Sequence, residues 1–109
     1  MICVMFSDVG SNTTKIRPVG EDVSLPCTVL DGAHIRWLRG DQELLPVSGH
    51  IPPDLHGRFS VKVRGRNEQE LLLSNVTVND SNVYTCLDGS VQHIFNLTVL
   101  GINILLYSI

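Results

Sequence analysis

The chain of 109 residues has few charges, no basic cluster and no long apolar run. Charged residues make up 17% of it and the net charge is −3. The largest basic run, from Lys62 to Arg66, is interrupted by Val63 and Gly65, which argues against nucleic acid as a partner. The apolar end, 101–109, is nine residues long, whereas a membrane-spanning helix needs about 20. That end is either the juncture before a membrane span or simply the end of this chain.

Helical periodicity is also absent. Short segments with alternating apolar and polar residues are separated by Gly, Asn, Asp and Pro, which is the pattern of an all-β chain. A chain of this length supplies one core. The sequence therefore predicts one all-β domain at residues 12–101, between an N-terminal segment (1–11) and an apolar tail (102–109).

Catalytic, cofactor-binding and metal-binding motifs are lacking. There is no nucleophile elbow and no glycine loop of the kind that holds phosphate. The histidines have no zinc-ligand spacing with a cysteine or with one another: His34, His50, His56 and His93. We therefore expect a chain that is not an enzyme and has no cofactor and no metal.

The chain does contain a framework built on two cysteines and a tryptophan. Trp37 follows Cys27 by ten residues, and Cys86 follows Cys27 by 59. Tyr84 lies on the same side of its strand as Cys86, because side chains alternate along a strand. The remaining matching residues are Arg58-Phe59-Ser60, Leu71, Leu73 and Asp80. This combination resembles the immunoglobulin superfamily, most closely the variable-type (V-set) domains of cell-surface immune receptors and butyrophilin-like ligands.

The resemblance implies an immunoglobulin-like β-sandwich of two antiparallel sheets with one inter-sheet disulfide between Cys27 and Cys86. Trp37 would pack against the bridge, and the Tyr84 hydroxyl would bond back to the upstream chain. Arg58 and Asp80 would form an ion pair that closes one end of the sandwich. A structural disulfide implies an oxidising compartment, so we expect a secreted protein or the extracellular part of a membrane-anchored one. Cys3 is then left over, as part of a terminus, a processing remnant or an inter-chain cysteine.

The alternation assigns the two faces of each strand. We expect a first edge strand at Lys15–Pro18 and a last strand at His93–Leu100, with 46–57 mainly a loop. The residues expected to face the core are Val23, Leu25, Cys27, Ile35, Trp37, Phe59, Val61, Val63, Leu71, Leu73, Tyr84, Cys86, Phe95, Leu97 and Val99.

Variable-type domains usually bind partners with one sheet, called GFCC′ in the family's lettering, or with the loops at its end. The partner-binding residues that we name on this basis are His34, Arg36, Leu38, Leu44, Thr85, Leu87, Asp88 and Gly89; Leu45 is the alternative to Leu44. Outward apolar residues there indicate a contact surface, although scattered exposed apolar residues are also normal. The short hairpin after Cys86 and the absence of Phe-Gly-x-Gly favour a germline-encoded receptor or ligand over an antibody.

Four segments match the N-glycosylation pattern Asn-x-Ser/Thr. We name Asn12, Asn75 and Asn96 as acceptors, while Asn79 is the weakest because Asp80 follows it. Four matches favour a glycoprotein. The function we predict is protein–protein recognition, with a cell-surface or secreted protein as partner and a possible homodimer through the GFCC′ sheet. The alternatives are homophilic adhesion and binding of a small ligand at the loop end, which requires a deep apolar pocket.

Overall fold

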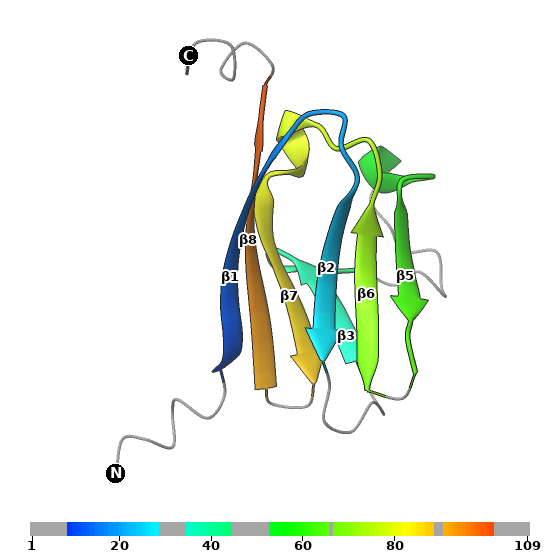
Figure 1. The fold of residues 1–109 in the computed structure, drawn as a ribbon, viewed down its shortest axis with the longest axis vertical. Coiled ribbons are helices and arrows are strands. Elements are labelled where there is room, and N and C mark those ends of the chain that lie inside the picture. The colour runs from blue at the N-terminus through cyan, green and yellow to red at the C-terminus, as the bar shows by residue number, and fades with distance from the viewer. Residues whose placement is uncertain (1–8, 29–34, 45–52, 66, 89–90, 102–109) are drawn as a thin grey trace.

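The computed structural model describes residues 9–28, 35–44, 53–65, 67–88 and 91–101. These residues form two sheets that pack face to face (Figure 1). The five-stranded sheet has the order β1 (Val9–Pro18), β8 (Val91–Leu100), β7 (Asn82–Asp88), β3 (Ile35–Arg39) and β4 (Gln42–Leu44). The three-stranded sheet has the order β2 (Val23–Thr28), β6 (Glu68–Leu73) and β5 (Phe59–Val63). The all-β sandwich predicted from the sequence is therefore confirmed.

The core lies between the two sheets and follows the predicted alternation closely. Val23, Leu25 and Cys27 of β2 are buried, as are Leu71 and Leu73 of β6. The five-stranded sheet contributes Trp37, Leu44, Tyr84, Cys86, Phe95, Leu97 and Val99. Phe59 and Val61 of β5 are partly buried against this cluster. Strands that alternate in this way leave every second side chain on the outer face of its sheet, and this arrangement positions the surfaces described below.

One inward assignment is wrong. Val63 is 66% exposed, although it continues the alternation of Phe59 and Val61. It lies at the end of the edge strand β5, and the apolar cluster that packs on this strand extends only to Val61. The alternation fixes the direction of a side chain but not whether anything lies beneath it.

The first strand is longer than predicted. β1 runs from Val9 to Pro18 rather than from Lys15, and it pairs in parallel with β8 along that length. β8 begins at Val91, two residues before the predicted start, and Val91 pairs with Asp88 of β7. β1 is thus an edge of the larger sheet.

The segment after β4 contributes one unexpected core residue. Within the predicted loop 46–57, the described part forms a 3-10 turn, η1 (Pro53–Leu55), and Leu55 is fully buried. A second 3-10 turn, η2 (Val78–Asp80), precedes β7. Neither of these described helices is long and apolar enough to cross a bilayer.

Candidate recognition surface

The disulfide and Trp37 hold the strands that carry the surface. Cys27 of β2 and Cys86 of β7 form the predicted disulfide, with their Cα atoms 6.5 Å apart. The Trp37 ring stacks on Phe95 at a centroid distance of 6.3 Å. Its Nε1 donates a hydrogen bond of 3.3 Å to Oε1 of Gln69 on β6. Because β3 is tied in this way to β8 and to the opposite sheet, the outer face of β3 is presented on a rigid support.

A second set of contacts closes one end of the sandwich. Arg58 donates from Nη1 to Oδ2 of Asp80 at 2.8 Å and from Nη2 to Oδ1 at 3.1 Å. Tyr84 donates its hydroxyl proton to the Asp80 carbonyl at 2.7 Å, which is the tyrosine corner that the resemblance implies. Burial raises the pKa of Tyr84 to about 12. Every member of this cluster has a structural partner, so it stabilises the fold and offers no reacting group.

The outer face of the five-stranded sheet carries an apolar centre. Leu38 of β3 lies opposite Thr85 of β7, and Arg36 lies opposite Leu87. Thr85 in turn lies opposite Ile94 of β8. Leu38, Thr85, Leu87 and Ile94 are all half-buried. We call these four residues the central cluster.

Ile94 was missed in the sequence-based assignment of this face. Its signal was nevertheless present, because Phe95, Leu97 and Val99 were assigned to the core and alternation then turns Ile94 outward. Val83 of β7 is a further outward apolar residue, 42% exposed and opposite Asn96.

An exposed ion pair borders the central cluster on the β4 side. Arg36 donates from Nε to Oε2 of Glu43 at 3.0 Å and from Nη2 to Oε1 at 2.9 Å. These hydrogen bonds hold the pKa of Glu43 below its usual value. Exposed pairs of this kind contribute little to stability. The pair matters here because it places a positive and a negative charge side by side on the surface.

Two of the predicted contact residues face the core instead. Leu44 is 2% exposed and pairs with Trp37, so the register of the β3–β4 hairpin turns it inward. Asp88 is 8% exposed and pairs with Ile35, which packs against the core. Both are therefore removed from the exposed surface. His34, Gly89 and Leu45, the alternative to Leu44, lie outside the described residues.

The β1 side of the same face is polar. Asn12 of β1 lies opposite Ile94, and Thr14 lies opposite Asn96. Asn96 donates from Nδ2 to Oδ1 of Asn12 at 2.7 Å. The face thus runs from an asparagine pair, across the central cluster, to the Arg36–Glu43 ion pair.

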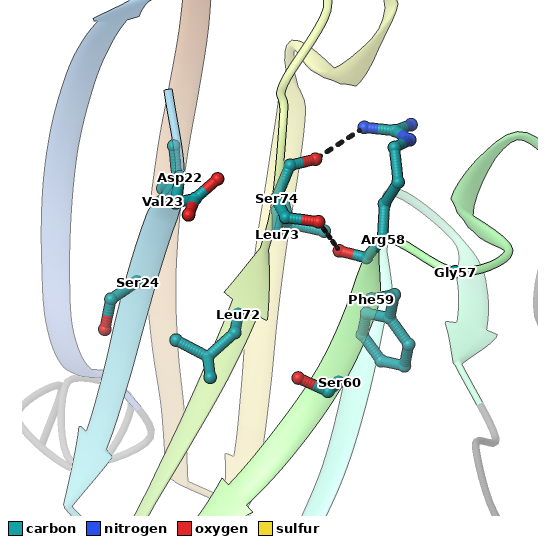
Figure 2. A pocket seen from close by; sticks show the side chains of 10 residues that line it. All are labelled: Asp22, Val23, Ser24, Gly57, Arg58, Phe59, Ser60, Leu72, Leu73 and Ser74. Carbon is teal, nitrogen blue, oxygen red and sulfur yellow. Dashed lines mark hydrogen bonds between the residues drawn. The ribbon is translucent and has the colours of Figure 1, made fainter. Parts of the chain in front are cut away.

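The outer face of the three-stranded sheet has a different character. Arg64 and Glu70 form an ion pair of 2.9 Å there, and the Ser24 hydroxyl donates to Glu70. A shallow groove of about 310 Å³ lies at the Ser74 end of this sheet, lined by Ser24, Ser60 and Leu72 among others (Figure 2). Arg58 at its edge is bonded to the Ser74 carbonyl at 3.2 Å.

Comparison with known proteins assigns the family. The immunoglobulin domain family model matches residues 9–87, and the chain therefore belongs to the immunoglobulin domain family. No curated protein sequence matches the chain.

Solved structures agree with the fold. The first immunoglobulin domain of the mouse polymeric immunoglobulin receptor matches with a TM-score of 0.66 at 20% identity, over 84% of this chain and 91% of that one. Domain I10 of titin matches with a TM-score of 0.65 at 24% identity, over 81% and 90%. The ZIG-8 IG1 homodimer matches with a TM-score of 0.65 at 23% identity, over 84% and 82%. Identities this low show the fold alone.

The described residues contain no group of three or more His, Cys, Asp or Glu side chains able to hold a metal ion. The arrangement that they do form is a rigid sandwich with an apolar centre on one outer face. Domains of this family generally mediate protein–protein interaction and are generally not enzymes.

Proposed function

We propose that this domain recognises another protein on the extracellular side of the membrane through the outer face of its five-stranded sheet. The observation that carries the proposal is the difference between the two outer faces. One has the central cluster of Leu38, Thr85, Leu87 and Ile94, whereas the outward side chains of the other include Leu72 but are mostly charged or hydroxyl-bearing, such as Glu70 and Arg64. A contiguous apolar surface with a polar rim is characteristic of a protein-binding site.

The sheet order supports a variable-type domain. β4 extends the sheet of β8, β7 and β3 next to β3, and variable-type domains differ from constant-type ones by added strands on that sheet. The hairpin after Cys86 is short, as in receptors that are not rearranged. We propose on these two grounds that the domain is part of an immune-type cell-surface receptor or of a butyrophilin-like ligand. It is either anchored in the membrane as part of a longer protein or secreted.

We also propose that the protein is N-glycosylated at Asn12, Asn75 and Asn96. Asn12 and Asn75 are exposed and Asn96 is half-buried at the sheet surface. Asn75 has a positive φ of 50°, a conformation in which Asn is better tolerated than most residues. That conformation alone accounts for an Asn at 75, so the strand positions 12 and 96 carry more of the argument.

Homophilic adhesion is the second candidate, and the ion pair favours it. Arg36 and Glu43 place both signs of charge side by side on the rim of one face. In a two-fold contact between copies, the same patch serves both partners, so each cation can face the other copy's anion. The neighbour named for its homodimer, ZIG-8 IG1, shares the fold.

The small-ligand alternative gains no support from the described groove. The groove lies on the other sheet, at the end where β6 terminates, and it is open to solvent with Asp22, Arg58 and three serines in its lining. It is not the deep apolar pocket at the loop end that this alternative requires.

The test is a screen of the purified domain against cell-surface ectodomains, together with sedimentation at high concentration. We expect Leu38→Asp to abolish binding, because a charge buried in the contact is left unpaired. Val63→Asp is the matched control, since Val63 is exposed on the other sheet. Equal loss in both variants, or unchanged binding by Leu38→Asp, contradicts the sheet-face proposal. Self-association that Leu38→Asp removes identifies the homophilic case.

A further inference from the structure

We infer that an N-linked glycan at the Asn12–Asn96 corner covers β1, β8 and the Val83 end of β7 on the outer face of the five-stranded sheet (the recognition face). The partner is then confined to the rest of that face, on β3, β4 and the Leu87 end of β7. This inference rests on the proposed function, because it concerns the same face. Its starting point is the placement of two sequons side by side on adjacent strands: Asn12 with Thr14 on β1, and Asn96 with Thr98 on β8.

The asparagine and the threonine of each sequon both lie on the outer face. In a strand, residues two apart point to the same side, so the asparagine and the threonine of one sequon project together. Core residues occupy the alternate positions of β8, at Phe95, Leu97 and Val99. Thr14 and Thr98 are both exposed. A sugar attached to either asparagine therefore leaves the molecule on the recognition face and not into the core.

The two attachment points form a single corner. The Asn96 amide nitrogen lies 2.7 Å from the Asn12 amide oxygen, so a glycan on either residue begins at nearly the same place. Asparagine is disfavoured in strands, yet both neighbouring strands carry one here. Their mutual hydrogen bond is one reason for the pair; the threonine two residues beyond each of them is not explained by that bond.

The register determines which residues a glycan would cover. Asn96 lies directly opposite Val83, and Asn12 lies directly opposite Ile94. Neighbouring strands are about 4.8 Å apart, so the first sugars would overlie these two apolar side chains. Leu38 and Arg36 are on β3, two strands away from β8, or about 10 Å.

The glycan would also shield the edge strand β1 of the sheet. Ile16, which follows Thr14 by two residues on β1 and lies opposite Thr98, is 55% exposed. An exposed apolar side chain on an edge strand invites association with other chains, and a bulky hydrated glycan beside it opposes this. The glycan thus shields Ile94 and Val83, while Leu38 and Leu87 of the central cluster stay open to a partner.

The variants that test this change the threonines and leave both asparagines in place. Thr14→Ala with Thr98→Ala removes both sequons while the Asn12–Asn96 hydrogen bond can still form. Thr14→Ser with Thr98→Ser keeps both sequons and is the matched control. Each protein is secreted from mammalian cells, its glycan occupancy is measured by peptide mass spectrometry, and its surface is labelled with a photoactivated carbene.

We expect a glycan on Asn12, Asn96 or both in the wild type and in the serine variant, and none at this corner in the alanine variant. Labelling of Val83, Ile94 and Ile16 should rise when the glycan is lost, while labelling of Leu38 stays the same. Two results overturn the inference: an unoccupied corner in the wild type, or an occupied corner with unchanged labelling of Val83 and Ile94.

The proposed function is tested separately by Leu38→Asp in the alanine variant, where no corner glycan is present. Retained binding there contradicts the proposed function and does not affect the labelling result.

Discussion

At the scale of single residues, the described part of the chain includes two arginine–aspartate pairs that differ in the burial of the aspartate. Asp80 is fully buried and faces Arg58, whereas the Asp54 side chain is 48% exposed and faces the largely buried Arg39 at 3.0 Å. Asp80 also accepts a hydrogen bond from the Thr77 backbone N–H at 2.8 Å, at the start of η2. The same chemical pair should therefore contribute very different amounts of stability in the two places.

We predict that Asp80→Ala lowers the free energy of unfolding by about 3 kcal/mol, because it removes a buried partner of Arg58 and a helix cap. Asp54→Ala is the control and should cost less than Asp80→Ala, since the Asp54 carboxylate is about half exposed and water screens its side of the pair. Urea unfolding of the two variants measures both values. Similar costs would show that burial does not set the contribution of these pairs.

The buried Tyr84 makes stability depend on pH on the alkaline side. Burial raises its pKa from 10.0 to about 12 in the folded state. A group whose pKa is raised by folding contributes stability that is present below the unfolded pKa and is lost as the pH rises toward the folded one. We expect roughly 2 kcal/mol to be lost between pH 10 and pH 12, with the small remainder lost just below and just above this range.

The measurement is urea unfolding across that pH range, with tyrosinate formation followed by ultraviolet absorbance. The chain has two tyrosines, so Tyr107→Phe isolates the signal of Tyr84. Tyr84→Phe should remove this pH-dependent loss, although it also loses the hydrogen bond to the Asp80 carbonyl. Ionisation of Tyr84 near pH 10 without unfolding would contradict the role of burial.

At the scale of strands, the alternation of side chains predicted most of the core because both sheets cover it from opposite sides. The alternation failed where the burial of a side chain depends on the elements packed around its strand, because the sequence of one strand does not show them. Val63 continues the pattern of β5 but is 66% exposed and does not belong to the core cluster of the described residues. Leu44 turns inward because the β3–β4 hairpin pairs it with Trp37, and the register of that hairpin could not be read from the sequence.

The parallel pairing of β1 with β8 was equally out of reach of the sequence, because a parallel partner is remote in the chain and leaves no local turn signal. The pairing brings Gly10 against β8. A Cβ added at Gly10 would lie 2.5 Å from Cε1 of His93 and 2.8 Å from Cγ1 of Val91. The His93 ring is not free to leave without cost, since its Nδ1 is bonded to the Ser11 hydroxyl at 3.0 Å.

We predict that Gly10→Ala destabilises the domain by roughly 1–3 kcal/mol, the usual cost of forcing an extra carbon into a packed contact. Hydrogen exchange should show faster exchange in β1 than in β7, because only the edge strand is displaced. Gly101→Ala is the control, since no atom lies within 4 Å of its Cβ position. Unaltered exchange in β1 would mean that the His93 side chain simply moves aside.

The free edge of β2 shows how the fold avoids unwanted pairing. Lys15 of β1 donates from Nζ to the Ser24 carbonyl at 2.7 Å, and Pro26 two residues later has no N–H to offer. Ser24 and Pro26 present their backbone groups to the same edge, because strand residues two apart do so. One acceptor is thus occupied and one donor is absent on an edge that would otherwise attract another strand.

At the scale of the whole molecule, the family's framework was predictable and the recognition surface only in part. Cys27, Trp37 and Cys86 have fixed spacings in the sequence, so they could be recognised without a structure. Leu38, Thr85 and Leu87 followed from alternation once the framework was known. Asp88 was misplaced because a turn-forming residue was taken to be exposed, whereas its pairing with Ile35 turns it inward.

The disulfide links these scales. The bond between Cys27 and Cys86 joins two single residues, but it restricts the conformations of the unfolded chain. The bridge closes a loop of 59 residues, worth about 4 kcal/mol in the chain-entropy model. Natural domains have net stabilities of about 5–15 kcal/mol, so this term is a large share of the total.

We predict that Cys27→Ala with Cys86→Ala lowers the urea midpoint strongly, whereas Cys3→Ser leaves it unchanged. A strong loss in Cys3→Ser would instead assign a stabilising role to the third cysteine. A reducing agent should lower the midpoint of the wild type and leave that of the double variant unaffected, which separates loss of the bridge from loss of packing by the two side chains.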